Sequence, residues 1–288
     1  MDKPLVSVIM NCYNSDSFLK EAIDSVYAQT YKNWEIIVWD NASTDSSSKI
    51  ANSYDKKLKY FYTSKNTLLG AARKSATEKA QGKYLAFLDC DDLWYEDKLK
   101  KQIKIFEESE ESLGIVYGRS EIIYEDGRQN KIFQKGQPLP EGMVFDIFAK
   151  NDFIPFVSAV VNKNYFLNCG GFPVHLKHST DYWVFAHLTH EYPVAALQEV
   201  CCKYRVHPNN LSSSAAVRMA GLLESIESLS CFLPEKEAKE GVAYYYVYLA
   251  ILYAKNWNLF RMVVVLTKNN IWWLFVKYVT NKIVYFNE

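Results

Sequence analysis

The sequence predicts an α/β protein with a doubly wound, mostly parallel sheet and a C-terminal helical extension. Short apolar segments rich in β-branched residues alternate with segments of helical periodicity over about the first hundred residues. Polar clusters follow the apolar segments directly, and near the C-terminus the composition changes to aromatic and basic residues. The alternation is typical of parallel sheets, because a helix usually connects one parallel strand to the next.

Four apolar segments are the predicted strands of the first part of the sheet: residues 5–10, 34–39, 58–62 and 84–88. The first two are rich in Val and Ile, which is typical of strands that are buried on both faces. Polar clusters follow three of these strands, at residues 11–14, 40–45 and 89–92. Ligands of doubly wound sheets bind beyond the carboxyl ends of the strands, so these clusters are the predicted site.

Two segments between these strands have the spacing of amphipathic helices. The first begins at Ser17 and gathers its apolar residues on one face, namely Leu19, Ala22, Ile23 and Val26. The second covers residues 67–81, and Gly82 is placed to end it, because glycine readily adopts the left-handed conformation of helix C-termini. A further helix is expected to start near Glu96.

Beyond these elements the pattern is mixed. Residues 115–124 and 129–134 flank Glu125-Asp126-Gly127-Arg128, and this arrangement predicts a hairpin. Later segments predict a turn, a helix and a strand, at residues 169–173, 180–190 and 197–206.

The composition excludes several classes of protein. Hydrophobic residues make up 49% and charged residues 23%, so the chain can bury a core and is not globally disordered. With 33 basic and 33 acidic residues the net charge is 0, which disfavours a nucleic-acid binder. The six cysteines form no CxxC pair, and the N-terminus lacks the apolar stretch of a signal peptide. We therefore expect reduced thiols in a cytoplasmic protein.

Residues 242–286 contain 13 aromatic and five basic residues and no acidic one. The longest apolar run, residues 242–254, is shorter than the roughly 20 residues that span a bilayer. We expect a peripheral membrane contact, because aromatic and basic helices lie in the interface and attract anionic lipid. The residues concerned include Trp272, Trp273, Phe275, Lys277, Tyr278, Lys282 and Phe286. The alternative is a helical cap on the rest of the chain or a contact with a second copy in a homodimer.

Asp89-Cys90-Asp91 follows a predicted strand. If the chain stayed extended, alternation would place both carboxylates on one side and Cys90 on the other. Two carboxylates at a strand end are typical of a hard-cation site that waters and phosphates complete. The alternative is that Asp91 or Asp92 caps the next helix. The chain has no GxxxxGK[ST] and no GxGxxG, so a metal rather than a glycine-rich loop would hold phosphates.

Other polar residues allow two interpretations each. Asp40, at the end of the second strand, could accept the imide N–H of a uracil or cap the following turn. Arg73, on the helix before the fourth strand, could reach a diphosphate or be a solvated helix charge. Asp181, at a helix start, could be a general base or an ordinary N-cap. His207, after a strand, could be a further metal ligand or a structural histidine.

A zinc site is the remaining metal hypothesis. His187 and His190 lie three residues apart on a predicted helix, with His175 and His178 nearby. No cysteine or carboxylate spacing supports such a site, so we do not favour it.

Three motifs together resemble glycosyltransferase family 2, which has the GT-A fold, a Rossmann-like α/β fold. They are PLVSVIMNCYN at residues 4–14, WEIIVWDNASTD at residues 34–45 and FLDCDD at residues 87–92. The spacing of Asn66, Gly70, Ala72 and Arg73 is similar to the family's helix before the DxD motif. Later segments also match, at Gly170-Gly171-Phe172, Asp181 and Tyr204-Arg205-Val206-His207-Pro208. The resemblance covers residues 4–212.

The resemblance implies roles for particular residues. Asn11, Tyr13, Asp40, Arg73 and Asp89 would bind the nucleotide sugar, with Tyr13 and Asp40 as nucleoside contacts and Asp89 at the ribose or a metal-bound water. Asp91 would be the metal ligand and His207 a supplementary metal or diphosphate ligand, the metal being Mn²⁺ or Mg²⁺. Asp181 would be the catalytic base. The catalytic domain would cover residues 1–212, with a nucleotide-sugar half (1–95) and an acceptor half (96–212), followed by a helical region (213–288).

Three positions depart from the family pattern. Asn11 stands where Pro is common, and Asn41 stands where a second Asp is common. Thr180 stands where an acidic residue often precedes the base, which leaves Asp181 as the carboxylate at that point.

The implied activity is inverting transfer of a sugar, with a UDP-sugar as the expected donor, to an acceptor hydroxyl. The acceptor would be a glycan or a lipid-linked sugar in bacterial-type surface polysaccharide synthesis, with no nucleic-acid partner. We expect a cytoplasmic enzyme that can work at the inner face of the membrane. Two alternatives are a nucleotidyltransferase, whose glycine- and basic-rich N-terminal loop is absent here, and a non-catalytic nucleotide-binding protein on the same fold.

Overall fold

The computed structural model describes residues 3–208, 210, 220–221, 223–225, 227, 235–255 and 258–276. The chain divides into two compact units. The first comprises Met1–Phe145 and Asp152–Asn210, and the second comprises Asp146–Asn151 and Leu211–Glu288. The domain boundary predicted at residue 212 lies outside the described residues and stays a prediction.

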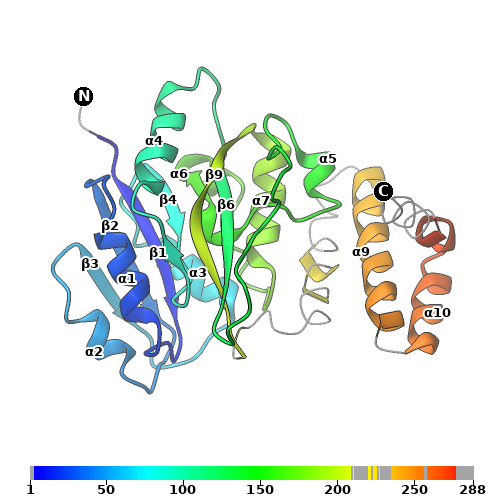
Figure 1. The fold of residues 1–288 in the computed structure, drawn as a ribbon, viewed down its shortest axis with the longest axis horizontal. Helices are drawn as coiled ribbons and strands as arrows, with labels where there is room; N and C mark the ends of the chain where they lie inside the picture. Colours follow the sequence, from blue (N-terminus) through cyan, green and yellow to red (C-terminus); the bar gives the residue numbers. More distant parts are fainter. Residues whose placement is uncertain are drawn as a thin grey trace. The chain divides into compact units, whose positions relative to one another are not determined.

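The first four strands form the parallel part of the sheet, as predicted (Figure 1). They are β1 (Val6–Cys12), β2 (Trp34–Asp40), β3 (Leu58–Tyr62) and β4 (Tyr84–Phe87). Their order is β3-β2-β1-β4, and Val6 of β1 pairs with Trp34 on one side and Tyr84 on the other. The strand order therefore reverses between β1 and β4, and this is the switch point at which such sheets bind ligands.

The helices of this part are α1 (Leu19–Tyr27), α2 (Ser47–Ala51), α3 (Leu69–Thr77) and α4 (Lys98–Glu108). The predicted apolar face of α1 is buried and packs in one core with Val8 and Ile36. The expectation that Gly82 ends α3 is wrong, because α3 already ends at Thr77. A Cβ on Gly82 would lie 2.6 Å from the backbone nitrogen of Ser7, so glycine is needed there for a close approach to β1.

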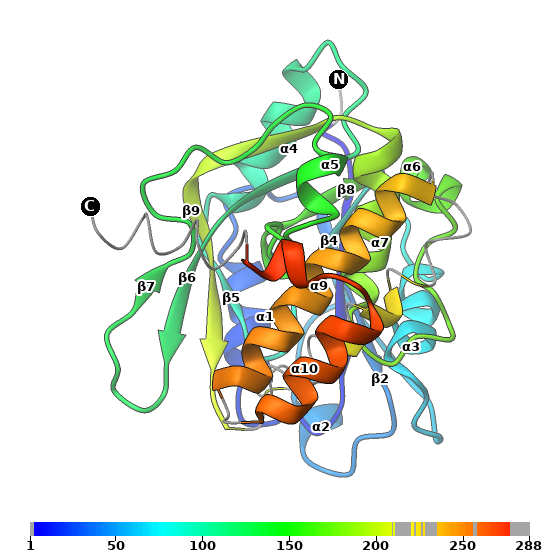
Figure 2. The same cartoon turned by 90° about the vertical axis from the view of Figure 1, so that its right-hand side faces the viewer.

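The sheet continues as a mixed sheet beyond β4, in the order β4-β8-β6-β9-β5. The added strands are β8 (Val160–Asn162), β6 (Ile115–Tyr124), β9 (Val194–Val206) and β5 (Leu93–Trp94). β8 is antiparallel to β4 and to β6, whereas β6 and β9 are parallel. The predicted hairpin forms between β6 and β7 (Lys131–Ile132), and it is visible in Figure 2.

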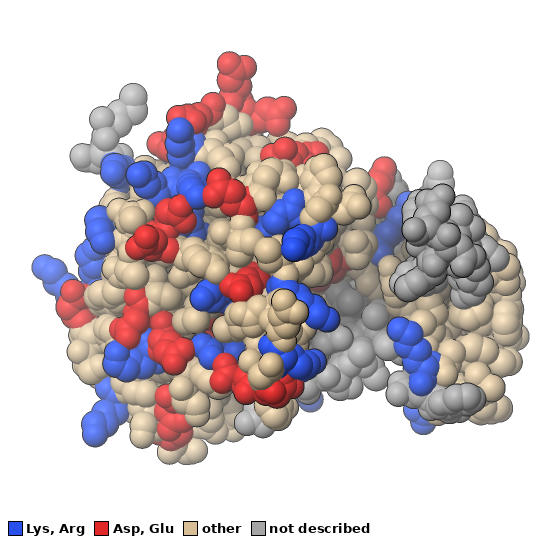
Figure 3. All heavy atoms as spheres, viewed as in Figure 1, with Lys and Arg blue, Asp and Glu red and all other residues tan. Residues whose placement is uncertain are grey.

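Short helices connect these strands: α5 (Phe145–Phe148), a 3₁₀ turn η1 (Phe156–Ser158), α6 (Lys163–Asn168) and α7 (Thr180–Glu191). The predicted turn before α7 contains Gly170 and Gly171, which both have positive φ angles of 87° and 67°. Acidic and basic side chains are interspersed over the face of the first unit that Figure 3 shows.

The second unit contains α9 (Glu235–Lys255) and α10 (Leu259–Lys268), which lie side by side in Figures 1 and 2. A core between them includes Val247, Ala250 and Leu266. No helix in the described part of the chain is long and apolar enough to span a bilayer. Four residues of the predicted membrane contact, Lys277, Tyr278, Lys282 and Phe286, lie outside the described residues.

Candidate active site

The polar clusters after β1, β2 and β4 meet at the switch point of the sheet. The Cys90 thiol donates a hydrogen bond to the Asn11 carbonyl oxygen over 3.2 Å, which joins the ends of β4 and β1. The Asn41 N–H donates to the Cys12 carbonyl oxygen over 2.8 Å, which joins the ends of β2 and β1. Parallel strands end at one edge of a sheet, so sequence order alone was enough to bring these loops together.

Residues 89–92 form a turn rather than an extended strand end. The Asp92 N–H donates to the Asp89 carbonyl oxygen over 3.1 Å, since β4 has already ended at Phe87. The expectation that the Asp89 and Asp91 carboxylates share one side of an extended chain is therefore wrong. Asp89 lies against Arg73, whereas Asp91 lies against His207.

Arg73 is buried and connects the 89–92 turn to the start of α7. Its Nη2 lies 3.3 Å from Asp89 Oδ1, its Nη1 donates to Thr180 Oγ1 over 2.8 Å, and the same Nη1 lies 3.7 Å from Asp181 Oδ1. The guanidinium lies 3.9 Å from the centre of the Phe156 ring. The alternative of a solvated helix charge is wrong, because only 7% of the Arg73 side chain is exposed.

Gly70 explains how α3 brings Arg73 to this position. A Cβ on Gly70 would lie 1.8 Å from the carbonyl oxygen of Pro173, and the Gly70 N–H donates to the Leu176 carbonyl oxygen over 3.3 Å. The missing side chain lets α3 pack directly on the segment that leads into α7. Thr180 stands where an acidic residue is common in the family pattern, and its hydroxyl oxygen accepts a hydrogen bond from Arg73.

Negative charge accumulates at this end of the sheet. The pKa of Asp89 is raised to about 6, because loss of hydration and the nearby Asp91 and Asp181 carboxylates disfavour its charge more than Arg73 stabilises it. Burial and the neighbouring Asp91 and Asp89 carboxylates raise the pKa of Asp92 well above its ordinary value. Burial and Asp181 do the same to the pKa of Asp152. A site with more carboxylates than cations favours a bound cation.

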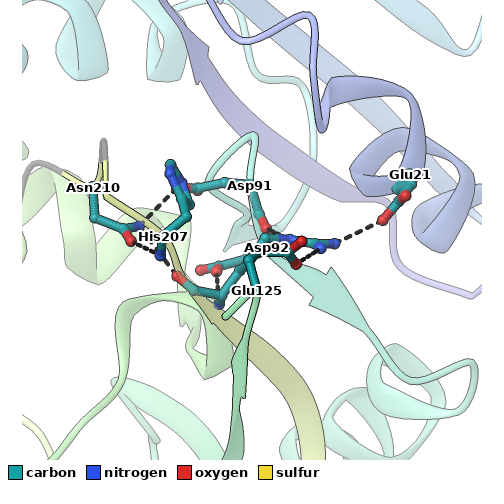
Figure 4. Close-up of polar contacts among 7 residues, drawn as sticks. Glu21, Asp91, Asp92, Glu125, His207 and Asn210 are labelled. Atoms are coloured by element: carbon teal, nitrogen blue, oxygen red, sulfur yellow. Dashed lines mark hydrogen bonds and ion pairs between the residues drawn. The ribbon is translucent and has the colours of Figure 1, made fainter. Parts of the chain in front are cut away.

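The Asp91 carboxylate and the His207 imidazole lie next to each other and could supply two ligand atoms for such a cation (Figure 4). His207 Nε2 lies 3.0 Å from Asp91 Oδ2, although the two residues are 116 positions apart. Among the described residues, no group of three or more His, Cys, Asp or Glu side chains could hold a metal, the histidines considered for zinc included. A carboxylate and an imidazole fit a divalent cation that keeps waters and takes its other ligands from a diphosphate.

The residues predicted to contact a nucleoside differ in how far they are bonded within the protein. Asp40 is fully buried; its Oδ1 accepts from the Ser43 N–H and its Oδ2 from the Tyr60 hydroxyl, both over 2.7 Å. Tyr13 is 54% exposed just after β1, and Asn11 Nδ2 is buried without a hydrogen-bond partner in the described part of the chain.

Asn41 is a residue whose role the sequence did not reveal. Its Nδ2 donates to the Thr67 carbonyl oxygen, while its Oδ1 accepts from the Thr67 N–H and hydroxyl. An aspartate could only accept, so the amide at this departure from the family pattern ties the loop before α3 to the end of β2.

Asp181 lies in the first turn of α7, where the helix dipole favours a negative charge. The N-cap of α7 is Ser179, so Asp181 is not the N-cap that the alternative interpretation required. Its side chain is 30% exposed and therefore accessible from solvent.

The family model named Glycosyl transferase family 2 matches residues 7–185. The chain belongs to glycosyltransferase family 2. The fold agrees, since Staphylococcus aureus TarS (residues 1–349, in complex with UDP-GlcNAc) superposes with a TM-score of 0.64 at 21% identity, covering 83% of this chain and 71% of that chain. The mannosyltransferase PcManGT from Pyrobaculum calidifontis, in complex with GDP-Man and Mn²⁺, gives 0.65 at 18% identity, covering 93% and 75%.

Two curated relatives of this family 2 glycosyltransferase are similar over most of their lengths. The chain is 30% identical over 217 residues to the Escherichia coli UDP-Glc:alpha-D-GlcNAc-diphosphoundecaprenol beta-1,3-glucosyltransferase WfgD, covering 74% of this chain and 82% of WfgD. It is 29% identical over 215 residues to the putative teichuronic acid biosynthesis glycosyltransferase TuaG of Bacillus subtilis, covering 74% and 83%.

Proposed function

We propose that this glycosyltransferase moves a sugar from a nucleoside diphosphate sugar, with a UDP-sugar as the donor, to an acceptor hydroxyl with inversion at the anomeric carbon. One observation carries the proposal: the buried Arg73 guanidinium contacts both Asp89, beside the donor-side turn, and Asp181, at the start of α7. The proposed base is thereby held next to the strand end at which nucleotides bind in this fold.

The donor would lie over the ends of β1, β2 and β4. Tyr13 is exposed enough to contact a base, and the buried Asn11 amide at the end of β1 has no hydrogen-bond partner in the described part of the chain. Asp40 would act mainly by holding the loop that carries Ser43, while Arg73 and Asp89 would face the ribose and diphosphate. The choice of UDP is supported by the similarity to WfgD, which is named as a transferase that uses UDP-Glc.

Asp181 would act as general base. It would take the proton of the acceptor hydroxyl while the acceptor oxygen forms the new bond to the anomeric carbon. The nucleoside diphosphate leaves from the opposite face of the sugar, so one displacement inverts the configuration. No covalent intermediate with the enzyme is required.

Asp91 and His207 would hold a divalent cation, Mn²⁺ or Mg²⁺. Such a cation stabilises the negative charge that develops on the leaving diphosphate. The use of Mn²⁺ is supported by PcManGT, which has the same fold and is in complex with GDP-Man and Mn²⁺.

The acceptor would be a lipid-linked sugar or a growing surface polysaccharide. The similarity to WfgD, named for a diphosphoundecaprenol-linked acceptor, and to TuaG, named for teichuronic acid biosynthesis, supports this choice. The helical region from residue 213 would bring the catalytic domain to the cytoplasmic face of the membrane. Phe260 and Trp273 of this region are 79% and 65% exposed, and Arg261 and Lys268 lie close to them in the sequence. Flotation with anionic vesicles, compared with a chain cut before Val242, separates membrane binding from a helical cap or a homodimer contact.

A panel of nucleotide sugars tests the proposed reaction. We expect one UDP-sugar to raise the melting temperature in the presence of Mn²⁺ and to be used for transfer to a lipid diphosphate carrying GlcNAc. Stabilisation by GDP- or ADP-sugars alone would contradict the donor, and hydrolysis or transfer with retained configuration would contradict the mechanism.

A further inference from the structure

The end of β9 is joined to the 89–92 turn by a hydrogen-bonded cluster whose members come from four parts of the chain (Figure 4). Two of these residues, Arg205 and Asn210, have no part in the proposed reaction. Both lie within hydrogen-bonding distance of Asp91, through its carbonyl oxygen and its carboxylate respectively.

The Asn210 side chain makes three hydrogen bonds. Its Oδ1 accepts from the His207 N–H over 2.5 Å. Its Nδ2 donates to Asp91 Oδ2 and to the Arg205 carbonyl oxygen, both over 3.1 Å. A single amide therefore connects the backbone of one proposed cation ligand to the carboxylate of the other.

The amide also sets the orientation of the Asp91 carboxylate. Oδ2 receives the Asn210 N–H and lies 3.0 Å from His207 Nε2, while Oδ1 has no hydrogen-bond partner in the described part of the chain. Fixing one oxygen restricts rotation of the carboxylate and leaves the other oxygen available to a cation. The Phe18 ring, 5.0 Å from the His207 ring between centres, limits the movement of the imidazole.

Arg205 holds the backbone of the same turn. Its Nε donates to the Asp91 carbonyl oxygen and its own N–H donates to Asp92 Oδ1, both over 2.8 Å. The guanidinium is fixed in turn by Glu125 on one side and by Glu21 at 2.7 Å on the other. A buried arginine with partners on α1, beyond the end of β6 and in the turn keeps Asp91 at a constant distance from β9.

We propose that Asn210, supported by Arg205, is a positioning residue for the divalent cation: it orients the Asp91 carboxylate and the His207 ring towards each other before the cation binds. The inference deepens the proposed function and depends on its metal site. Hydrogen-bond partners of metal ligands typically change metal affinity by about 10–100-fold when they are removed. A preorganised pair of ligands loses less conformational freedom on binding.

Mn²⁺ binding to the full-length protein tests the proposal. The electron paramagnetic resonance signal of free Mn²⁺ is titrated with wild type, Asn210→Ala and Asn130→Ala, each with and without UDP. Asn130 is a matched control, since it is exposed and its Nδ2 also donates to a carboxylate, Glu121 Oε1, over 2.9 Å. We expect Asn210→Ala to raise the Mn²⁺ dissociation constant by about 10–100-fold and Asn130→Ala to leave it unchanged.

Steady-state kinetics separate positioning from a general structural role. Asn210→Ala should raise the Mn²⁺ concentration needed for half-maximal activity, while kcat at saturating Mn²⁺ returns to within a few-fold of wild type. A structural defect would lower kcat at every Mn²⁺ concentration, and that result would overturn the inference.

Arg205→Lys provides a second variant if Asn210→Ala fails to fold. Lysine keeps the charge but not the fork that reaches Glu21, Glu125 and the Asp91 carbonyl oxygen together. It should weaken Mn²⁺ binding in the same direction, unlike Arg128→Lys, whose arginine is exposed and pairs only locally with Asp126. If both Asn210→Ala and Arg205→Lys bind Mn²⁺ with wild-type affinity, the positioning inference is overturned but the proposed metal site is not. If the wild-type chain itself binds no Mn²⁺, the metal site is contradicted.

Discussion

Two buried arginines contact the 89–92 turn, and they do so in different ways. Arg73 and Arg205 are 5% and 6% exposed, and each lies over a phenylalanine ring, Phe156 at 3.9 Å and Phe18 at 4.5 Å. Arg73 contacts the turn through the Asp89 carboxylate. Arg205 contacts it through the Asp91 carbonyl oxygen and through its own N–H, which donates to Asp92.

The charged partners of the two arginines differ as well. Arg73 lies between Asp89 and Asp181, whose side chains are 38% and 30% exposed and belong to the proposed site. Arg205 pairs with Glu21 and Glu125, which are 60% and 42% exposed. Arg73 therefore balances the charge of two carboxylates of the proposed site, whereas Arg205 fixes the backbone of the turn.

The largest expected effect is on the Arg73 side. Asp181→Asn keeps the size of the side chain and its position in α7, but the amide cannot take a proton. The rate of sugar transfer should therefore fall by about 10²–10⁴-fold. Nucleotide affinity should change little, because the proposed donor contacts do not include Asp181. Steady-state transfer measured beside nucleotide titration checks both statements, with Asp126→Asn as an exposed control. Turnover within a few-fold of wild type would rule out Asp181 as the base.

Removing each arginine compares their contributions to stability. Arg73→Met leaves the Asp89 and Asp181 carboxylates without their positively charged partner. The free energy of unfolding should fall by about 3 kcal/mol, which is the low end for a broken buried ion pair, because both carboxylates are partly exposed. Arg205→Met should cost less, because water can solvate Glu21 and Glu125. Urea denaturation measures both, with Arg128→Met expected within about 0.5 kcal/mol of wild type. The comparison fails if Arg205→Met is the more destabilising change.

Asp91→Asn tests whether the Arg205 side of the turn serves a cation. The amide can still accept from His207 and Asn210, but it carries no charge, so the gain in UDP affinity that Mn²⁺ provides should drop by at least about tenfold, or roughly 1.4 kcal/mol. Calorimetry with UDP, with and without Mn²⁺, measures this gain. Equal UDP affinity in all four combinations of protein and metal would remove Asp91 from the metal site.

Lys98 is a third buried cationic residue, and its partners differ from those of Arg73 and Arg205. Lys98 donates to Gln102 Oε1 over 2.7 Å and lies 4.2 Å from the centre of the Trp94 ring, but no carboxylate in the described part of the chain pairs with it. Burial lowers the pKa of Lys98 from 10.5 to about 8. The folded protein therefore holds this proton less tightly than the unfolded chain does, and stability rises with pH from about 8 towards 10.5.

The pH dependence gives the smallest expected effect. Lys98 should contribute a rise of about 1 kcal/mol in the free energy of unfolding between pH 8 and pH 9. Lys98→Met should abolish that part of the rise. Urea denaturation of both proteins at the two pH values measures the difference, and parallel pH profiles would show that Lys98 does not titrate in this range.

Much of the fold could be predicted from the sequence, because strands and helices each have a characteristic spacing of apolar residues along the chain. The apolar runs predicted β1 to β4 within one or two residues, and the spacing on α1 predicted its buried face. β8 was not predicted, since its three residues are too few to show a period. Only its pairing with β4 and β6 places it inside the sheet.

The candidate site divides in the same way. The sequence by itself determined which loops carry polar residues and, through the order of parallel strands, that they meet at the edge between β1 and β4. Tertiary structure alone decided the partners: Arg73 with Thr180 across 107 positions, and Asp91 with His207 across 116. The turn at residues 89–92 also redirected two carboxylates that an extended chain would have kept together. Periodicity reports on neighbours a few residues apart, whereas contacts across a hundred residues depend on how the whole chain packs.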